Sequence, residues 1–376
     1  SIGKKSIHKG RIKVLYTISK SEFTSGEKEK VFLKTISGLD KNVFDPFLFT
    51  YSENEHSIKS LSDENALLTE KLTETPSVKS REYSVSMMTL IRIFNKVNPD
   101  IIHSLSETDD YNEALAAKIN GIKWVNNQSE RDNKLINTKD LRFKLSDALI
   151  NRSKIKNGST EKGKHYSIPT GININEFSGI EEDEKLILKY NLKESNPIVL
   201  TSVDGSDKKG LETLIKGFAL AHEDYENAKL IISGKVSPEF KKTILNLIKE
   251  YGIKGNTVIT GNDFEITKLY RIADLYIISN SKEVSVYNDS VLEAMAGRII
   301  CFGSDVNGLG EFFRKSSDQL FESENPGSIA NKILFFMKLD ETERPERIKR
   351  QIDFVKNNFS REKEVEMFED LYKNLV

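Results

Sequence analysis

Residues 197–233 read PIVLTSVDGSDKKGLETLIKGFALAHEDYENAKLIIS, and their pattern of apolar and polar residues predicts the fold class. A short apolar run at 197–202 is followed by a polar loop. Apolar side chains at helical spacing then occupy 210–221, and a second apolar run follows at 228–233. A strand, a helix and a strand in this order form a βαβ unit with parallel strands.

The same alternation runs through most of the chain. In the first half it predicts strands at 12–18, 44–51, 101–103, 123–127 and 146–150, and helices at 28–39, 88–97 and 111–120. In the second half it predicts further strands at 256–260, 274–279 and 298–302, and helices at 238–251, 265–272, 290–296 and 326–337. Helical spacing resumes from Arg347 to the end and is interrupted near 358–360.

The segment 166–177 contains Pro169 and Gly171 and separates two similar halves. We therefore predict an α/β protein with two Rossmann-like domains, each built on a parallel sheet. The first domain comprises residues 11–167 together with 359–376, the linker is 168–180, and the second domain is 181–358. The strand at 146–150 is expected to be the last of the first half.

Composition narrows the classes of partner. The 376 residues include 56 Lys and Arg against 57 Asp and Glu, so the chain has no global field that would attract nucleic acid. Cys301 is the only cysteine, which favours a reducing, cytoplasmic setting. No apolar run is long enough to span a bilayer, and the basic start at 1–11 lacks the apolar core of a secretory signal. Peripheral contact with the inner face of a membrane stays open, and the abundance of Lys, Asn, Ile and Glu hints at a bacterial source.

Four segments that follow predicted strands or join the halves resemble family 4 glycosyltransferases, in that family's order. They are IPTGININEF at 168–177, KKGLETLIKGF at 208–218, IADLYIIS at 272–279 and VLEAMA at 291–296. The C-terminal segment 354–375 is also similar to the family's crossover helix, which returns to the N-terminal domain. The resemblance implies the GT-B fold, in which the two domains face a cleft and this helix crosses back.

The resemblance also implies a function. It is that of a retaining, metal-independent glycosyltransferase, which moves a sugar such as a hexose from a UDP- or GDP-linked donor to an acceptor. The acceptor would be a glycan, a lipid-linked molecule or a small molecule, as in polysaccharide biosynthesis. The donor would bind the C-terminal domain as co-substrate, with no cofactor and no metal, and the acceptor would bind the N-terminal domain.

Two residues of the second half match donor-binding positions of the family. Lys209, with Lys208 beside it, lies at a predicted helix start, where a cation and backbone N–H groups stabilise a leaving diphosphate. The alternative is a solvated surface lysine. Glu293 matches the glutamate that accepts hydrogen bonds from the ribose, and its alternative is an exposed carboxylate near a helix start.

Two further matches lie in the first half. Gly26 stands where the family has a glycine loop that approaches the donor phosphate, although a generic turn explains it equally well. His103, the second catalytic candidate beside Lys209, ends a predicted strand. The family often has a second histidine two residues later, and here that position is Leu105. A buried, hydrogen-bonded histidine is therefore the favoured alternative.

The chain departs from the family pattern at two donor-site positions. Alignment on Lys209 puts Asp204 where the family has an arginine, and an aspartate there would repel phosphate. Ser285 replaces the first glutamate of the pair that ends at Glu293. Four residues of the same turn are then the candidates for contacts with the donor and its sugar: Ser285, Asn288, Asp289 and Ser290. Glu283 could substitute only if the loop bulges.

These departures leave a second hypothesis open, in which the chain is a degenerate GT-B protein that binds a nucleotide or a protein partner without transfer. Another GT-B-like enzyme, such as a sugar epimerase or a phosphorylase, is a third. A nucleotide-dependent oxidoreductase is disfavoured, because no Gly-x-Gly-x-x-Gly follows the first strand.

Overall fold

The computed structural model of the chain describes residues 10–18, 27–50, 68–69, 86–105, 111–128, 144–152, 164–177, 182–203, 207–234, 236–261, 266–282, 289–306, 308–313 and 317–376. The chain divides into two compact units. Unit 1 is Ser1–Gly171 with Arg361–Val376, and unit 2 is Ile172–Ser360. The division falls inside the predicted linker, and the chain returns to unit 1 two residues later than predicted.

Unit 1 is built on a parallel sheet with the strand order β3-β2-β1-β4-β5-β6-β7. Its strands are β1 (Ile12–Ile18), β2 (Phe44–Thr50), β3 (Leu68–Thr69), β4 (Ile101–Ser104), β5 (Lys123–Gln128), β6 (Ala148–Asn151) and β7 (His165–Ser167). Its helices in the described residues are α1 (Glu27–Ser37), α3 (Met87–Val97), α4 (Asn112–Ile119) and α14 (Arg361–Leu375). The prediction that the first half ends with its strand near 150 is wrong, because β7 pairs with β6 and extends the sheet.

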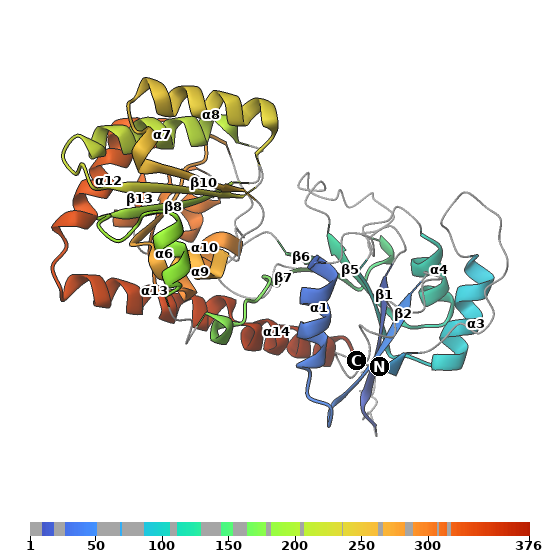
Figure 1. Cartoon of the computed structure of the whole chain (residues 1–376). Helices are drawn as coiled ribbons and strands as arrows, with labels where there is room; N and C mark the ends of the chain where they lie inside the picture. Colours follow the sequence, from blue (N-terminus) through green and yellow to red (C-terminus); the bar gives the residue numbers. More distant parts are fainter. Residues whose placement is uncertain are drawn as a thin grey trace. The chain divides into compact units, whose positions relative to one another are not determined.

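The two faces of this sheet have separate cores, as the alternation of side chains along each strand requires. Val14 and Tyr16 of β1 face one way and pack with side chains of α1 and α14. Leu15 faces the other way and packs with side chains of α3 and α4. The C-terminal helix α14 therefore belongs to unit 1, as the resemblance implied (Figure 1).

Unit 2 is also a parallel sheet, with the order β10-β9-β8-β11-β12-β13. Its strands are β8 (Ile198–Val203), β9 (Lys229–Gly234), β10 (Thr257–Gly261), β11 (Leu275–Ile278), β12 (Ile300–Ser304) and β13 (Leu320–Phe321). Its α-helices are α6 (Glu184–Lys189), α7 (Lys208–His222), α8 (Pro238–Glu250), α9 (Ile266–Ile272), α10 (Asp289–Ala296), α11 (Leu309–Phe312), α12 (Pro326–Lys338) and α13 (Glu343–Phe359). Short 3-10 turns are η2 (Ile174–Glu176), η3 (Lys254–Asn256) and η4 (Ser317–Gln319).

Helices cover both faces of this sheet as well (Figure 1). Side chains of α7, α8 and α12 form a core with one face, while α10 and α13 pack together on the other. The predicted strands and helices of this half are present within a few residues of their expected bounds, and Ser360 separates α13 from α14 as predicted. The sequence did not predict α6, β3 or β13, because six-residue and two-residue elements give too short a pattern.

Candidate functional site

The order of strands in unit 2 reverses between β8 and β11, which pair with each other. From β8 the chain continues to β9 and β10 on one side, and β11 to β13 lie on the other. Ligands of open α/β sheets bind at such a switch point, beyond the carboxyl ends of the strands. Because α7 follows β8 and α10 follows β11, the predicted residues at 208–209 and 289–293 lie on the two helices that leave this point.

The start of α7 is fixed by Asp207, a residue whose role the sequence analysis missed. Its carboxylate accepts hydrogen bonds from Gly210 N at 2.9 Å, Ser281 N at 2.6 Å and Ser281 Oγ at 2.7 Å. Burial opposes ionisation, but the hydrogen bonds from Gly210 and Ser281 prevail and lower the pKa of Asp207. The available signal was an aspartate three residues before Gly210, which is the pattern of a helix N-cap.

Gly210 lets α7 approach the segment that follows β11. A Cβ atom at this position would lie 2.0 Å from Ser279 O and 3.1 Å from Asn280 Cα. Any other residue would therefore push the helix start away from β11. Together, Gly210 and Asp207 join the start of α7 to the chain that leads towards α10.

Lys208 and Lys209 are the first two residues of α7, so the predicted helix start is confirmed. The side chain of Lys209 is 63% exposed, and its Nζ lies 2.6 Å from Glu324 Oε2. Lys208 Nζ lies 5.5 Å from the centre of the Phe240 ring. The two lysines thus have different surroundings, and only Lys209 forms an ion pair among the residues described.

The side chain of Glu293 is mostly buried. The alternative of an exposed carboxylate near a helix start is therefore not met. Tyr270 Oη lies 3.3 Å from its Oε2 and 3.2 Å from Ser290 O. Burial first, and then the charge of Asp289, raise the pKa of Glu293 to about 7. A carboxylic acid with this pKa changes its charge near neutral pH, so small changes in its surroundings determine whether it carries a charge.

A second buried tyrosine connects Glu293 to the other side of the switch point. Tyr276 of β11 lies against Tyr270, and its Oη is 2.5 Å from Ser202 Oγ at the end of β8. Ser290 at the start of α10 also hydrogen-bonds to Tyr276. The two tyrosines therefore hold β8, α9, β11 and α10 in fixed relation around Glu293.

Of the remaining predicted donor residues, some are described by the structure and others are not. Asp289 lies exposed at the start of α10, and Ser290 follows it. Gly26, Ser285 and Asn288 lie outside the described residues, as do Asp204 and Glu283. Their proposed contacts with the donor stay predictions.

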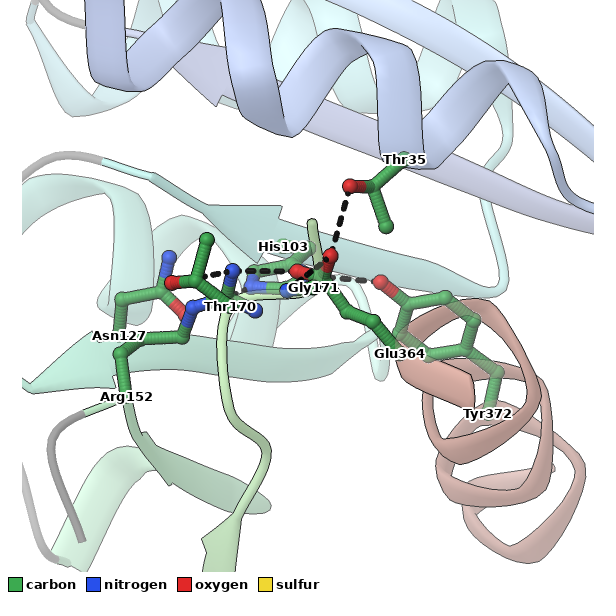
Figure 2. A network of polar contacts seen from close by, with 8 residues as sticks. All are labelled: Thr35, His103, Asn127, Arg152, Thr170, Gly171, Glu364 and Tyr372. Carbon is green, nitrogen blue, oxygen red and sulfur yellow. Dashed lines mark hydrogen bonds and ion pairs between the residues drawn. The ribbon is translucent and has the colours of Figure 1, made fainter. Parts of the chain in front are cut away.

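His103 belongs to unit 1, on β4, and is fully buried. Its Nδ1 lies 2.7 Å from Tyr372 Oη and its Nε2 lies 3.1 Å from Asn127 Oδ1, as Figure 2 shows. Burial lowers the pKa of His103 to about 3, which keeps the imidazole neutral. This is the buried, hydrogen-bonded histidine that the sequence left as an alternative, since side chains of the protein occupy both ring nitrogens.

Beside His103, Glu364 attaches α14 to unit 1 (Figure 2). Its side chain is fully buried and pairs with Arg152. The other carboxylate oxygen accepts hydrogen bonds from Thr35 Oγ1 and Gly171 N, both at 2.9 Å. The carboxylate thus links α14 to α1, to the end of β6 and to the last residue before unit 2.

In the part of the chain that the structure describes, three or more His, Cys, Asp or Glu side chains never cluster in a way that could hold a metal ion. Among the same residues, every helix is too short or too polar to cross a membrane.

Residues 182–353 match the family model of the glycosyl transferases group 1. The N-acetyl-alpha-D-glucosaminyl L-malate synthase of Bacillus anthracis is 26% identical over 189 residues. That alignment covers 50% of this chain and 48% of the enzyme, so the chain spans about half the length of the curated relative it matches.

Two solved structures resemble the chain along almost its whole length. A glycosyltransferase from Rickettsia africae has a TM-score of 0.74 at 19% identity, with 97% of this chain and 98% of that chain covered. Anabaena HepE, solved in complex with UDP and glucose, has a TM-score of 0.69 at 14% identity, with 97% and 100% covered. The chain therefore has the GT-B fold, and residues 182–353 of unit 2 belong to the glycosyl transferases group 1 family.

Proposed function

We propose that the chain is a retaining glycosyltransferase that takes a sugar from a nucleoside diphosphate and needs no further cofactor or metal. The observation that carries the proposal is the arrangement at the switch point of unit 2. There the lysines at the start of α7 and the buried carboxylate of Glu293 stand on two helices joined through Asp207, Ser281 and the two tyrosines. The family match of unit 2, and the UDP in the structure of HepE, support a nucleotide-sugar ligand.

The start of α7 would bind the diphosphate. Lys209 supplies a positive charge on an exposed, movable side chain, which could exchange Glu324 for a phosphate oxygen. Asp207 already accepts from Gly210 N, so the N–H groups that this helix start would offer to an anion are those of Lys208 and Lys209. As the sugar leaves the diphosphate, negative charge grows on the phosphate oxygen, and these groups would stabilise it.

Glu293 would bind the ribose. An ionised carboxylate accepts hydrogen bonds from two hydroxyl groups, which a protonated one does less well. Because the pKa of Glu293 is about 7, nucleotide binding would have to shift it to the ionised form near neutral pH. Asp289, Ser290, Ser285 and Asn288 would contact the donor and its sugar from the turn before and at the start of α10.

The transfer itself would proceed on one face of the sugar. The bond between the anomeric carbon and the diphosphate oxygen breaks, and the acceptor oxygen bonds to the anomeric carbon from the same side. The acceptor proton passes to the departing phosphate oxygen, so no side-chain nucleophile takes part. This step retains the anomeric configuration, and no catalytic role is assigned to His103.

The acceptor would be a glycan, a lipid-linked molecule or a small molecule, and one surface of unit 1 supports a site at a membrane. Met88 and Ile119 are 61% exposed and Leu115 is 37% exposed, on the neighbouring helices α3 and α4. Three cations with exposed side chains lie on the same two helices: Arg92, Lys96 and Lys118. Apolar and basic side chains together fit an anionic bilayer surface.

The proposal is tested by calorimetric titration with UDP, GDP and their sugars. We expect one nucleotide to bind, and Lys209→Ala to weaken its binding about tenfold, because a charge-assisted contact to phosphate is lost. Lys216→Ala, seven residues further along α7, is the matched control and should bind normally. Equal affinity in wild type and Lys209→Ala would reject the role of Lys209 in binding phosphate.

A catalytically degenerate binding module remains the second candidate, because Asp204 and Ser285 replace residues that the family uses at the donor site. The two candidates differ in turnover. Slow hydrolysis of the bound nucleotide sugar would support the transferase. Tight binding without any hydrolysis, in the presence of varied acceptors, would favour the module.

A further inference from the structure

Unit 2 contains a pocket of about 310 Å³ that lies away from Glu293. Met295 of α10 lines this pocket, together with Phe313 and with side chains of α13 and η4. Glu293 is two residues from Met295, and two residues on a helix are separated by about 200°. Glu293 therefore contacts Tyr270 from one side of α10, and the pocket lies on the other side.

The floor of the pocket is apolar and firmly held. Met295 and Phe313 are buried, and the ring of Phe354 is partly exposed. A Cβ atom at Gly303 of β12 would lie 2.8 Å from the ring of Phe313, so this ring rests directly on the backbone of the sheet. The partly exposed ring of Phe354 is therefore the apolar surface that the described lining offers to a ligand.

One wall consists of amides that are already used by the protein. Gln351 accepts from Cys301 N at 3.0 Å and donates to Ile299 O at 2.9 Å. Gln319 donates to Cys301 O at 2.9 Å. These bonds satisfy backbone groups at the start of β12, before the part of the strand that pairs with β13. The two amides therefore shape the pocket, and a ligand would hydrogen-bond to other groups.

Other lining side chains, on α13, are polar and exposed. Arg350, Asp353 and Asn357 are spaced by three and four residues on α13 and therefore share one face of the helix. Among the described residues, none of the three has a hydrogen-bonding or charged partner. A guanidinium, a carboxylate and an amide thus stand beside the partly exposed ring of Phe354.

The charges of the described lining residues balance. Arg347 and Arg350 are matched by Asp318 and Asp353, and Arg347 pairs with Asp318. The buried Nε of Arg347 has no hydrogen-bond acceptor in the structure. A phosphate would meet two carboxylates here, and a hydrocarbon would bury the polar groups without partners, so neither ligand fits well.

We propose that this pocket binds one neutral pyranose ring, as a sugar unit of a glycan. The C–H face of the ring packs on the partly exposed ring of Phe354. Its hydroxyl groups donate to Asp353 and accept from Arg350 and Asn357. The site thus combines polar side chains for the hydroxyl groups with an aromatic ring for the C–H face. The volume is at the lower end of the range for small-molecule pockets, which suits one sugar ring. The proposal does not depend on the transfer reaction.

The test is saturation-transfer NMR on the full chain with methyl α-glucopyranoside and methyl α-mannopyranoside, first without nucleotide and then with added UDP. The double variant Asp353→Ala/Asn357→Ala removes two exposed recognition groups without touching the core. Lys349→Ala/Lys356→Ala alters exposed residues of the same helix outside the pocket and serves as the control. We expect at least one glycoside to bind wild type and control alike, and the pocket variant to bind it roughly fivefold more weakly or not at all.

Four outcomes would overturn the proposal: no glycoside binds, the pocket variant binds as well as wild type, UDP displaces the glycoside, or inorganic phosphate does so. UDP affinity should be the same in the pocket variant and wild type. A loss of UDP binding in Lys209→Ala alone would concern the donor site, so failures of the two proposals can be told apart.

Discussion

Among single residues, Glu293 of unit 2 is an ionisable carboxyl for which we propose contacts with ribose. Glu293 is held by Tyr270 and kept from water, and these surroundings raise its pKa to about 7. The sequence could indicate the position of Glu293 through the VLEAMA segment. It could not indicate the pKa, because that depends on burial and on Asp289 being near in space.

We expect the affinity for a nucleotide sugar to depend on pH through Glu293. In the protein without nucleotide, the pKa of Glu293 is raised to about 7, and binding favours the ionised form. The affinity should therefore be highest above pH 7. It should fall by up to about tenfold for each pH unit below 7, until the pKa of the complex is reached. Titration calorimetry at roughly pH 5 to pH 8 measures how steeply the affinity depends on pH. Glu293→Gln should bind weakly with a flat profile, and an unchanged slope in this variant would assign the titration to another group.

His103 should make the stability of unit 1 sensitive to acid. Its pKa is lowered to about 3 in the folded state, against about 6.5 in an unfolded chain. The stabilisation is therefore present above pH 6.5 and is lost, at up to about 1.4 kcal/mol per unit, as the pH falls towards 3. Trp124 is the only tryptophan and lies buried in unit 1, so its fluorescence in urea titrations reports this unit.

The comparison needs two variants. His103→Leu should be less stable at neutral pH, because Tyr372 and Asn127 lose a partner, but its stability should vary less between pH 6.5 and pH 4.5. His222→Gln, on α7 of unit 2, should keep the wild-type slope. If His103→Leu also keeps that slope, the acid sensitivity arises elsewhere.

Among elements, α3 and α4 carry exposed apolar and basic side chains, and the proposed contact of these helices with a membrane can be measured. We expect the chain to float with vesicles that contain anionic lipid and to remain unbound with neutral vesicles, because the cations need a negative surface. Met88→Ser/Ile119→Ser should reduce flotation, since both side chains are well exposed and their replacement leaves the core intact. Leu188→Ser removes an equally exposed side chain, 72% exposed on α6 of unit 2, and should float like wild type. Flotation that does not depend on lipid charge would contradict this assignment.

The start of α7 illustrates what a pattern can and cannot predict about an element. The sequence predicted the helix and placed Lys209 at its start. Asp207 and Gly210 then act across the fold, because the partners of Asp207 and the neighbours of Gly210 lie about 70 residues later in the chain. A helical pattern contains no information about such contacts.

At the scale of the whole molecule, each unit has its own hydrophobic core, so we expect two transitions in scanning calorimetry. A bound nucleotide should raise the melting temperature of the unit 2 transition alone. At a nucleotide concentration one hundred times Kd, the free energy of unfolding of unit 2 should rise by about 2.7 kcal/mol. Glu364→Ala should lower only the unit 1 transition, towards the lower end of about 3–5 kcal/mol, because Arg152, which is 19% exposed, loses its carboxylate but keeps Thr170. Trp124 fluorescence identifies which transition is which.

Glu366→Ala is the control for the second change, since it alters an exposed ion pair of the same helix, with Lys363. It should leave both transitions nearly unchanged. If Glu364→Ala and the nucleotide instead shift a single common transition, the two units unfold together.

Local patterns in the sequence were enough to predict the alternation of strands and helices, the division into two α/β halves and the segments that resemble the group 1 family. Those properties depend on local periodicity and on turn and helix-start residues, which act over a few positions. The tertiary structure decided that His103 is a buried core residue, that Glu293 is mostly buried with a raised pKa, and that α14 is attached to unit 1 through Glu364. Each of these depends on groups far apart in the chain, and burial by such groups sets both hydrogen bonding and charge.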